Sequence, residues 1–221
     1  MRYKYRKAYN WNTDIAYFAG LMASDGCLYN DGRHINITSK DLEIIDNVRN
    51  IVNASTKVTT KLGQYHTSTY NFTFGDVALY DFLFEAGITP HKSKTIQSVT
   101  VPDKYYPDFL RGLFDGDGTV YGYLEPYWGC HKYYVGFYSA SYNFLLWLRK
   151  VNHRLLNSTY GSISRAGRVY ILRYGKADSQ ILFNAMYYLG FGSRLTRKYL
   201  KLRDFISADP RAKITIEARV L

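Results

Sequence analysis

Two aspartates stand two residues apart among glycines in the segment FLRGLFDGDGTV, residues 109–120. The segment YFAGLMASDGCL, residues 17–28, repeats this pattern but has alanine at the position of Asp115. The aspartates that both segments keep are Asp25 and Asp117. Two carboxylates held close together repel each other unless a cation lies between them, and Mg²⁺ binds both carboxylate and phosphate oxygens. The repeated acid therefore predicts metal-dependent chemistry on a phosphodiester, with one carboxylate from each copy.

Each acid must be positioned by the helix that precedes it. Thr13 is expected to cap a helix over residues 14–24 that ends at Gly26, and a second helix is expected over residues 104–115 that ends at Gly118. Small residues recur at intervals of four in both helices, which allows two helix backbones to approach closely. The small residues expected at this helix interface are Gly20, Ser24, Gly112 and Gly116. Packing of the two helices would bring the two acids together.

The elements that follow the two helices also repeat, which indicates an internal duplication. Strands are expected within residues 27–38, 57–74, 119–124, 133–139 and 159–174. Further helices are expected at residues 39–52, 76–88, 141–156 and 177–191. This order predicts an α+β protein of two tandem, pseudo-symmetric halves. The expected parts are a basic N-terminal arm at 1–12, a first half at 13–95, a linker at 96–103 and a second half at 104–221.

Composition restricts the class of partner. The 221 residues include 29 Lys and Arg against 18 Asp and Glu, and this net charge of +11 favours a polyanion. The 23 tyrosines and 12 phenylalanines, interleaved with basic residues, suit a nucleic-acid surface. Cys27 and Cys130 form no CxxC pair, so a zinc site is not expected and a reducing compartment is indicated. No apolar run approaches the roughly 18 residues of a membrane span. We therefore expect an intracellular protein with no membrane partner, in a prokaryotic cytoplasm or an organelle.

The two segments FAGLMASDG and LRGLFDGDG resemble the paired motifs of the LAGLIDADG homing endonucleases. The resemblance implies two αββαββα halves packed through their motif helices, with antiparallel sheets that form a DNA-binding saddle. It implies that Asp25 and Asp117 are catalytic acids that bind the metal, with the backbone carbonyls of Ser24 and Gly116 as possible further ligands. The sixth motif position varies in that family, so alanine there does not imply a lost site.

The activity implied by the resemblance is site-specific cleavage of double-stranded DNA. Because one chain carries both motifs, it would act as a monomer and cut each strand of a long asymmetric target. That target would span about two turns of B-DNA, or roughly 20 base pairs. The implied cofactor is Mg²⁺ or Mn²⁺, and Ca²⁺ is expected to bind without supporting cleavage. Intron homing is the biological role that the resemblance implies.

Basic residues near the acids are implied as further members of the site. Lys92, in GITPHKSKT, is the expected lysine of the first half, with Lys94 as the alternative. Lys198, in GSRLTRKYL, is its expected counterpart in the second half. Lys40, at a strand-to-helix junction, is a further catalytic candidate. Its counterpart lies near Ala140 and Ser141, so the two sites are expected to differ.

Polar residues of the strands are expected to read the DNA. Arg and Gln side chains can make bidentate contacts with base edges, whereas Lys mostly contacts phosphate. The candidate DNA-binding residues are Asn30, Arg33, Lys57, Lys61, Gln64, Arg165, Arg168 and Arg173.

Two alternative functions compete with DNA cleavage. A relative with the same fold could bind DNA or RNA without cutting, as an intron maturase or a transcription factor does. A haloacid-dehalogenase-like phosphatase is the more distant alternative, because FDGDGTV matches a DxDGT signature in which Asp115 would be the nucleophile. That chemistry requires Asp115 to follow an apolar parallel strand, whereas the residues before it have helical spacing.

Overall fold

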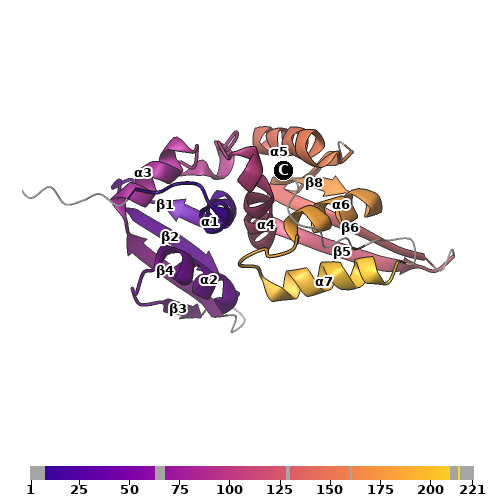
Figure 1. Cartoon of the computed structure of the whole chain (residues 1–221), viewed down its shortest axis with the longest axis horizontal. Coiled ribbons are helices and arrows are strands. Elements are labelled where there is room, and N and C mark those ends of the chain that lie inside the picture. Colours follow the sequence, from indigo (N-terminus) through magenta and orange to yellow (C-terminus); the bar gives the residue numbers. More distant parts are fainter. Residues whose placement is uncertain (1–7, 63–67, 128–129, 160, 210–213, 215–221) are drawn as a thin grey trace, which may run out of the picture.

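The computed structural model describes residues 8–62, 68–127, 130–159, 161–209 and 214, and the chain divides into two similar halves (Figure 1). The elements of the first half are α1 (Thr13–Ser24), β1 (Gly26–Leu28), β2 (His34–Ser39), α2 (Leu42–Val52), β3 (Thr59–Leu62), β4 (Ser68–Gly75), α3 (Val77–Glu85) and the 3-10 helix η2 (Lys92–Lys94). The elements of the second half are the 3-10 helix η3 (Asp103–Tyr105), α4 (Tyr106–Asp117), β5 (Gly118–Glu125), β6 (Cys130–Ser139), α5 (Tyr142–Leu156), β7 (Ser162–Ala166), β8 (Val169–Tyr174), α6 (Lys176–Met186) and α7 (Thr196–Ser207).

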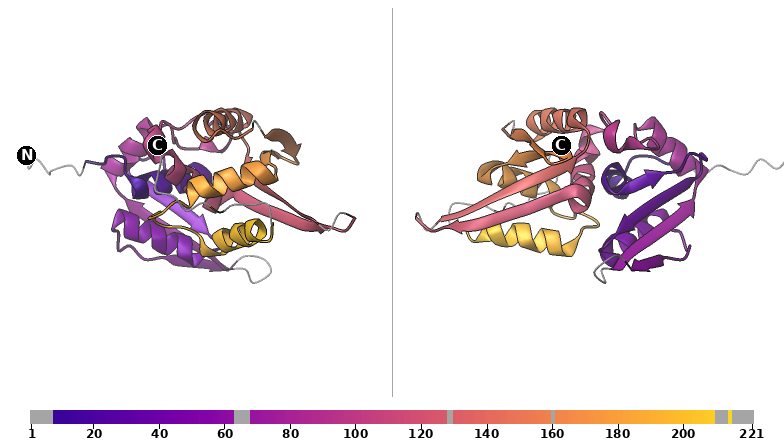
Figure 2. Two further views of the ribbon diagram at one scale, coloured as in Figure 1. Left: turned by 45° about the vertical axis from the view of Figure 1, so that its right-hand side comes forward. Right: turned by 180° about the vertical axis from the view of Figure 1, so that it is seen from behind.

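Each half contains a four-stranded sheet with the same strand order. The orders are β1-β2-β4-β3 and β5-β6-β8-β7, and every pairing in these two sheets is antiparallel. The helices α1 and α4 lie between the two sheets at the centre of the molecule (Figures 1 and 2). The predicted α+β class with two tandem halves is confirmed.

One face of each sheet packs against helices and the other face is open. In β2 and β4 the side chains of Ile35, Ile37 and Phe72 are fully buried, whereas the intervening residues of these strands face the other side. This alternation follows from the period of two in a strand, where successive side chains point to opposite faces. In the second half, Val135 and Phe137 of β6 bury the same face under α5 and α6.

The helix starts differ in detail from the sequence-based expectation. Asn12, rather than Thr13, caps α1, because Asn12 has extended backbone and its Oδ1 accepts a hydrogen bond of 2.8 Å from the N–H of Ile15. The second motif helix begins at Tyr106, two residues later than expected, because a 3-10 turn occupies the residues before it. The helix expected over residues 177–191 ends at Met186.

Gly26 and Gly118 follow the motif helices for a packing reason rather than a conformational one. Gly118 has a φ of −75°, so it is not in the left-handed region where a helix-ending glycine is usually found. A Cβ on Gly118 would lie 2.4 Å from the carbonyl oxygen of Phe114, and one on Gly26 would lie 2.3 Å from Sδ of Met22. The chain therefore passes directly from each helix into a strand, and a side chain at either glycine would clash with the helix.

The second half ends in a helix that the expected αββαββα pattern does not include. Helix α7 packs on the covered face of the second sheet, where Phe205 stacks on Tyr133 with ring centroids 6.2 Å apart. In the chain order of the first half, the short helix η2 follows α3 as α7 follows α6 in the second half. Among the described residues, no helix is both long and apolar enough to cross a membrane.

Candidate active site

The motif helices α1 and α4 cross with their backbones in direct contact at two glycines. A Cβ on Gly20 would lie 2.1 Å from the carbonyl oxygen of Phe109, and one on Gly112 would lie 2.0 Å from that of Tyr17. Any side chain larger than hydrogen at either position would push the helices apart. The expected interface of small residues is therefore the place where the two helices meet.

Contact between the helices continues to their C-terminal ends. A Cβ on Gly116 would lie 1.9 Å from Oγ of Ser24, whose hydroxyl donates to the carbonyl oxygens of Gly20 and Leu21. The same Cβ position is 3.4 Å from Oδ2 of Asp25. Because Asp117 directly follows Gly116, the two repeated acids lie side by side where the helices end.

The two carboxyl groups influence each other electrostatically. The pKa of Asp25 is raised to about 6, mainly because surrounding atoms desolvate the carboxyl group and then because of the negative charge of Asp117. Burial also raises the pKa of Asp117. The positive charges of Lys198 and Lys92 act in the opposite direction on both acids. Asp25 is nevertheless among the exposed residues and lines a hollow, so a ligand can reach it.

Lys198 and Lys92 donate hydrogen bonds to backbone carbonyls at the C-terminal ends of the motif helices. Nζ of Lys198 donates to the carbonyl oxygens of Phe114, Asp115, Gly116 and Gly118 over 2.7–2.8 Å. The carbonyl of Phe114 also accepts from the N–H of Gly118, whereas those of Asp115 and Gly116 belong to the last turn of α4, whose carbonyls lack partners within the helix. A cation at this end is also favoured by the helix dipole.

Lys92 makes the equivalent contacts in the first half. Its Nζ donates to the carbonyl oxygens of Gly26 over 2.6 Å and Ser24 over 3.2 Å. Burial lowers the pKa of Lys92 and lowers that of Lys198 to about 8. Lys94, the alternative candidate, is exposed. The two proposed carbonyl ligands, those of Ser24 and Gly116, therefore already accept a hydrogen bond from a lysine.

Two hollows flank the acids, and their lining differs. Asp25 lines a hollow of about 340 Å³ together with Lys40, Asp41 and Arg197. Asp117 lines a smaller hollow of about 200 Å³, and no Lys or Arg is among its described lining residues. The two sites therefore differ, because Lys40 and Arg197 line the Asp25 hollow and no described Lys or Arg lines the Asp117 hollow.

Local geometry identifies the counterpart of Lys40. Oγ of Ser39 accepts from the N–H of Asp41 over 3.1 Å, and Oγ of Ser139 accepts from the N–H of Ser141 over 3.1 Å. The residue between the two bonded positions is Lys40 in the first half and Ala140 in the second, where it lines the Asp117 hollow. The second site therefore has a methyl group where the first has an ammonium group.

An ion pair between the halves was not anticipated from the sequence. Arg197 on α7 donates to both carboxylate oxygens of Asp41, from Nε over 2.7 Å and from a terminal nitrogen over 2.6 Å. Nearby, the N–H of Thr196 donates to Glu43 over 3.0 Å. These contacts join residues more than 150 positions apart, so no local pattern could have revealed them.

Asp115 has a structural position rather than a catalytic one. Its side chain is 1% exposed, and Oδ2 accepts from the hydroxyl of Tyr17 over 2.9 Å and from the N–H of Leu195 over 2.7 Å. Burial raises its pKa to about 6. It lies within a helix and is covered by protein, so it cannot attack a phosphate ester. The structure therefore contradicts the phosphatase alternative.

The same contact explains why the first motif lacks this aspartate. The counterpart of Tyr17 in α4 is Phe109, and the counterpart of Asp115 in α1 is Ala23. A phenylalanine has no hydroxyl that needs an acceptor, so an alanine opposite it leaves nothing unpaired. The Tyr17 hydroxyl and the Asp115 carboxyl therefore face each other in one of the two symmetry-related contacts, and Phe109 and Ala23 replace both in the other.

The candidate DNA-binding residues do not all lie on the open faces of the sheets. Lys61 on β3 and Arg173 on β8 do, because they pair in register with Thr69 and Gly136 of that face. The β1–β2 and β7–β8 turns and the loop before β3 carry Asn30, Arg33, Arg168 and Lys57. Arg165 pairs with Tyr170, on the helix-covered side of the sheet. Gln64 lies outside the described residues.

Several described residues of the open faces were missed by the sequence analysis. On the first sheet they are Asn36, Thr38, Asn71 and Thr73, and on the second they are Thr119, Tyr121, Tyr134 and Tyr138. The signal was present in the alternation of polar and apolar residues along β2 and β4. In β5 and β6 that signal is weaker, because tyrosines occur on both faces.

No group of three or more His, Cys, Asp or Glu side chains close enough to hold a metal ion is found among the described residues. Of the carboxylates that line the two hollows, Asp41 is held by Arg197 and Asp115 by Tyr17 and Leu195, so Asp25 and Asp117 are the candidate metal ligands. Mg²⁺ needs few protein carboxylates, because waters and substrate phosphates complete its coordination. The site fits an ion that is shared with a bound phosphodiester.

Several solved structures share the fold of the chain at low sequence identity. Full-length WhiA from Thermatoga maritima matches with a TM-score of 0.60 and 14% identity, over 91% of this chain and 62% of that chain. The homing endonuclease I-WcaI, bound to its DNA recognition sequence, has a TM-score of 0.58 and 12% identity over 87% of this chain and 88% of its own. The LAGLIDADG homing endonuclease I-GzeII, in complex with a DNA target, has a TM-score of 0.58 and 12% identity over 89% of each chain.

These similarities establish the fold and no more than the fold. The chain spans less than two thirds of the length of full-length WhiA, whose N-terminal domain is described as a LAGLIDADG domain. No protein-family model matches the chain, and no curated protein matches it by sequence.

Proposed function

We propose that the protein is a site-specific, divalent-metal-dependent DNA endonuclease that cuts both strands of a long asymmetric target. The observation that carries this proposal is the placement of one carboxylate from each half, Asp25 and Asp117, at the ends of two helices in contact. The pseudo-twofold relation of the halves suits the two strands of a duplex. The net charge of +11 favours a polyanionic substrate.

The LAGLIDADG fold also supports a DNA partner, because solved neighbours with this fold are DNA-bound homing endonucleases. We propose that the chain acts as a monomer inside the cell, since it carries both acids itself, and that its role is intron homing. We propose a target of about two turns of B-DNA, in which each of the two sheets binds one half of the target.

Each side chain at the site has a separable task in this proposal. Asp25 and Asp117 would hold Mg²⁺ or Mn²⁺ against the phosphodiester. A bound ion would supply Lewis-acid activation of the phosphate and of the attacking water. Lys40 would attract a phosphate group into the Asp25 hollow, which already carries Arg197. Lys92 and Lys198 would act as positioning residues, because their ammonium groups hold the helix ends that carry the acids.

Replacement of each acid tests the proposal. Target sites are first selected from a randomised duplex library and cloned into a plasmid. Asp117→Asn and Asp25→Asn should each abolish double-strand cleavage in Mg²⁺, while the Kd for the site in Ca²⁺ stays within a few-fold of that of the unaltered protein. Asp46→Asn is the matched control, because it removes the same charge from an exposed position on α2. A plasmid that either acid variant still linearised would show that the acids are not the catalytic groups.

A second candidate is a nucleic-acid-binding protein that does not cleave. It is favoured by the lack of Lys and Arg among the described lining residues of the Asp117 hollow. The lysines beside the acids also direct their ammonium groups to backbone carbonyls. This candidate predicts tight binding of a selected duplex and no cleavage in Mg²⁺, Mn²⁺ or Ca²⁺. The same plasmid assay therefore distinguishes the two functions.

A further inference from the structure

The open faces of the two sheets carry different chemical groups. On the first sheet, amides and hydroxyls bond to one another: Nδ2 of Asn36 donates to Oγ1 of Thr73, and Nδ2 of Asn71 donates to Oγ1 of Thr38, both over 2.8 Å. On the second sheet, aromatic rings and methyl groups occupy much of the open face. Two halves with the same fold therefore present unlike surfaces to the same kind of substrate.

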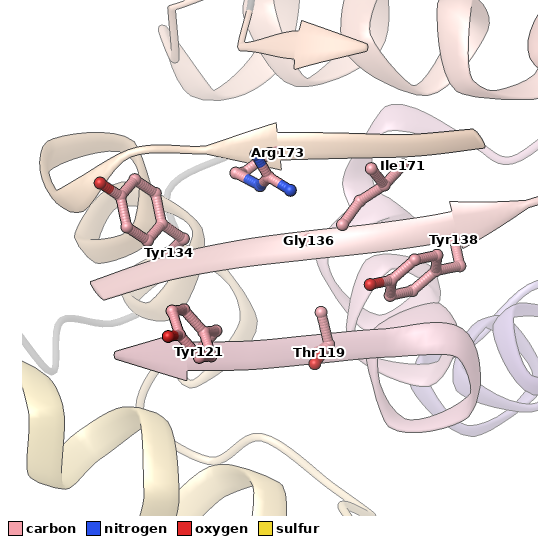
Figure 3. A pocket seen from close by; sticks show the side chains of 7 residues that line it. All are labelled: Thr119, Tyr121, Tyr134, Gly136, Tyr138, Ile171 and Arg173. Carbon is pink, nitrogen blue, oxygen red and sulfur yellow. The ribbon is translucent and has the colours of Figure 1, made fainter. Parts of the chain in front are cut away.

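A hollow of about 490 Å³ lies on the open face of the second sheet (Figure 3). Its floor is Gly136, flanked by two methyl groups: a Cβ on this glycine would lie 2.9 Å from Cδ1 of Ile171 and 3.2 Å from Cγ2 of Thr119. Around this floor stand tyrosine rings, including Tyr121, which is 63% exposed. The hollow is therefore lined mainly by apolar atoms that face solvent.

Arg173 is the charged residue among the described residues that line this hollow. Arg173 pairs across the sheet with Gly136, and its guanidinium lies over the hollow beside the rings (Figure 3). Lys132, on the same face, forms an ion pair of 2.9 Å with Glu125. Arg173 thus places a planar guanidinium group, with several N–H donors, between tyrosine rings and methyl groups.

The chemistry of this face matches particular base edges of duplex DNA. In the major groove, a guanidinium binds both O6 and N7 of guanine, and apolar side chains contact the C5-methyl group of thymine. The rings of Tyr121 and Tyr123 are tilted by 49° to each other with centroids 6.1 Å apart, so they do not form a parallel platform. Parallel platforms suit stacking of unpaired bases, whereas tilted rings offer their edges and faces to methyl groups.

We propose that the second half recognises a half-site in which a guanine is flanked by thymines. Arg173 would bind the guanine, and Tyr121, Tyr134, Ile171 and Thr119 would contact thymine methyl groups. This inference rests on the proposed function, because it requires the open face to lie in the major groove of a duplex. The first half, whose open face carries amides and threonines and no described aromatic ring beside them, would have a weaker preference for methyl groups.

The first experiment locates the half-site. Duplexes are selected from a randomised library in EDTA, so that binding is measured without cleavage, and Arg173→Ala is selected in parallel. The half-site whose sequence preference this variant relaxes is the one that the second sheet binds. We expect the preference for guanine at one position there to fall by about 5- to 150-fold.

The second experiment removes single methyl groups from the DNA. Each thymine of that half-site is replaced by deoxyuridine, which keeps its base pairing and lacks only the methyl group. We expect the Kd to rise about fourfold for each methyl group in contact. The same replacements in the other half-site serve as the matched DNA control and should raise the Kd less than the replacements in the half-site bound by the second sheet.

A protein variant assigns the methyl contact to the tyrosines. Tyr121→Ser, at a position already 63% exposed, should reduce the deoxyuridine effect at one or more thymines. Tyr142→Ser, at a 44% exposed tyrosine outside the sheet, should leave the effect unchanged.

The outcomes separate this inference from the proposed function. A selected duplex that binds tightly but shows no deoxyuridine effect in that half-site would overturn the inference and leave the proposed function intact. A library that yields no bound duplex would contradict the proposed function itself. Tighter binding of a single strand than of the duplex would overturn the inference in favour of stacking on unpaired bases.

Discussion

Alanine at Gly20 or Gly112 should disturb the candidate active site through the helix crossing alone. Neither residue touches the acids, and both are backbone-to-backbone contact points between α1 and α4. In an exposed helix position, glycine to alanine would stabilise the protein by about 1 kcal/mol. At the crossing, the added Cβ meets backbone atoms that cannot rotate away. The sign of the stability change therefore reports whether the helices are paired as described.

The size of the effect follows from the distances. A Cβ added at Gly20 would lie 2.1 Å from a carbonyl oxygen, and Cβ atoms essentially never come closer than 3.0 Å to such a neighbour, so the helices must separate by about 0.9 Å. Overpacking of this kind costs about 1–3 kcal/mol. In a protein of this size, that change lowers the Tm by about 2–12 °C. Mg²⁺ demands near-ideal octahedral geometry at about 2.0–2.1 Å, so a shift near 1 Å should reduce cleavage by orders of magnitude.

Gly175→Ala is the matched control for both glycine variants. Gly175 has a φ of −73°, and a Cβ added there would have no neighbouring atom within 4 Å, so alanine fits without strain. Thermal melting and plasmid cleavage would be measured on Gly20→Ala, Gly112→Ala and Gly175→Ala. We expect the first two to lose both stability and activity and the third to keep both. Crossing variants that were stabilised and fully active would refute the paired-helix arrangement of the site.

Two further predictions concern the charged groups around the acids. Lys198→Met should lower the free energy of unfolding in urea by about 3 kcal/mol or more, because it leaves several buried carbonyl oxygens without the lysine donor. Lys92→Met should lower it by less, because Lys92 donates to two carbonyls. Equal losses in the two variants would contradict this reasoning. With a pKa of about 6, Asp25 is mostly protonated at pH 5 and mostly ionised at pH 7, so calorimetric titration should show Mn²⁺ binding weaken as the pH falls through 6. Asp25→Asn should weaken that pH dependence and leave the part due to Asp117, whose pKa is also raised, and an affinity of the unaltered protein that was the same at pH 5 and pH 7 would contradict the assignment.

The sequence carried enough local information to predict most of the helices and strands. The small residues at intervals of four identified the helix pair, and the repeated acid identified the residues at its end. The cap of α1 was misassigned because Asn12 and Thr13 both have a side chain that can cap, and only the backbone conformation decides between them. The position of Arg165 depends on strand register, which is set by the β7–β8 turn and not by polarity in an edge strand exposed on both faces.

Contacts between the halves lay beyond sequence reasoning. Asp41 and Arg197 are separated by 156 positions, and each alone has the appearance of an ordinary surface charge. Asp115 stood in a motif and suggested chemistry, but its bond to Tyr17 depends on how the two helices face each other. Lysines near the acids were predicted, whereas their role as donors to helix carbonyls required the geometry of the helix ends.

The bond between Tyr17 and Asp115 also means that the two halves can no longer be exchanged for each other. A homodimer of first halves would place the Tyr17 hydroxyl opposite Ala23, and a homodimer of second halves would place the Asp115 carboxyl opposite Phe109. The first arrangement buries the Tyr17 hydroxyl without an acceptor, at a cost of about 1–3 kcal/mol for each symmetric copy. The second arrangement removes one of the two donors to Asp115 and leaves only the N–H of Leu195. If the chain were divided between the halves into two polypeptides, the fragments would therefore assemble as a heterodimer. An interface descended from a duplication has in this way become selective for the unlike partner.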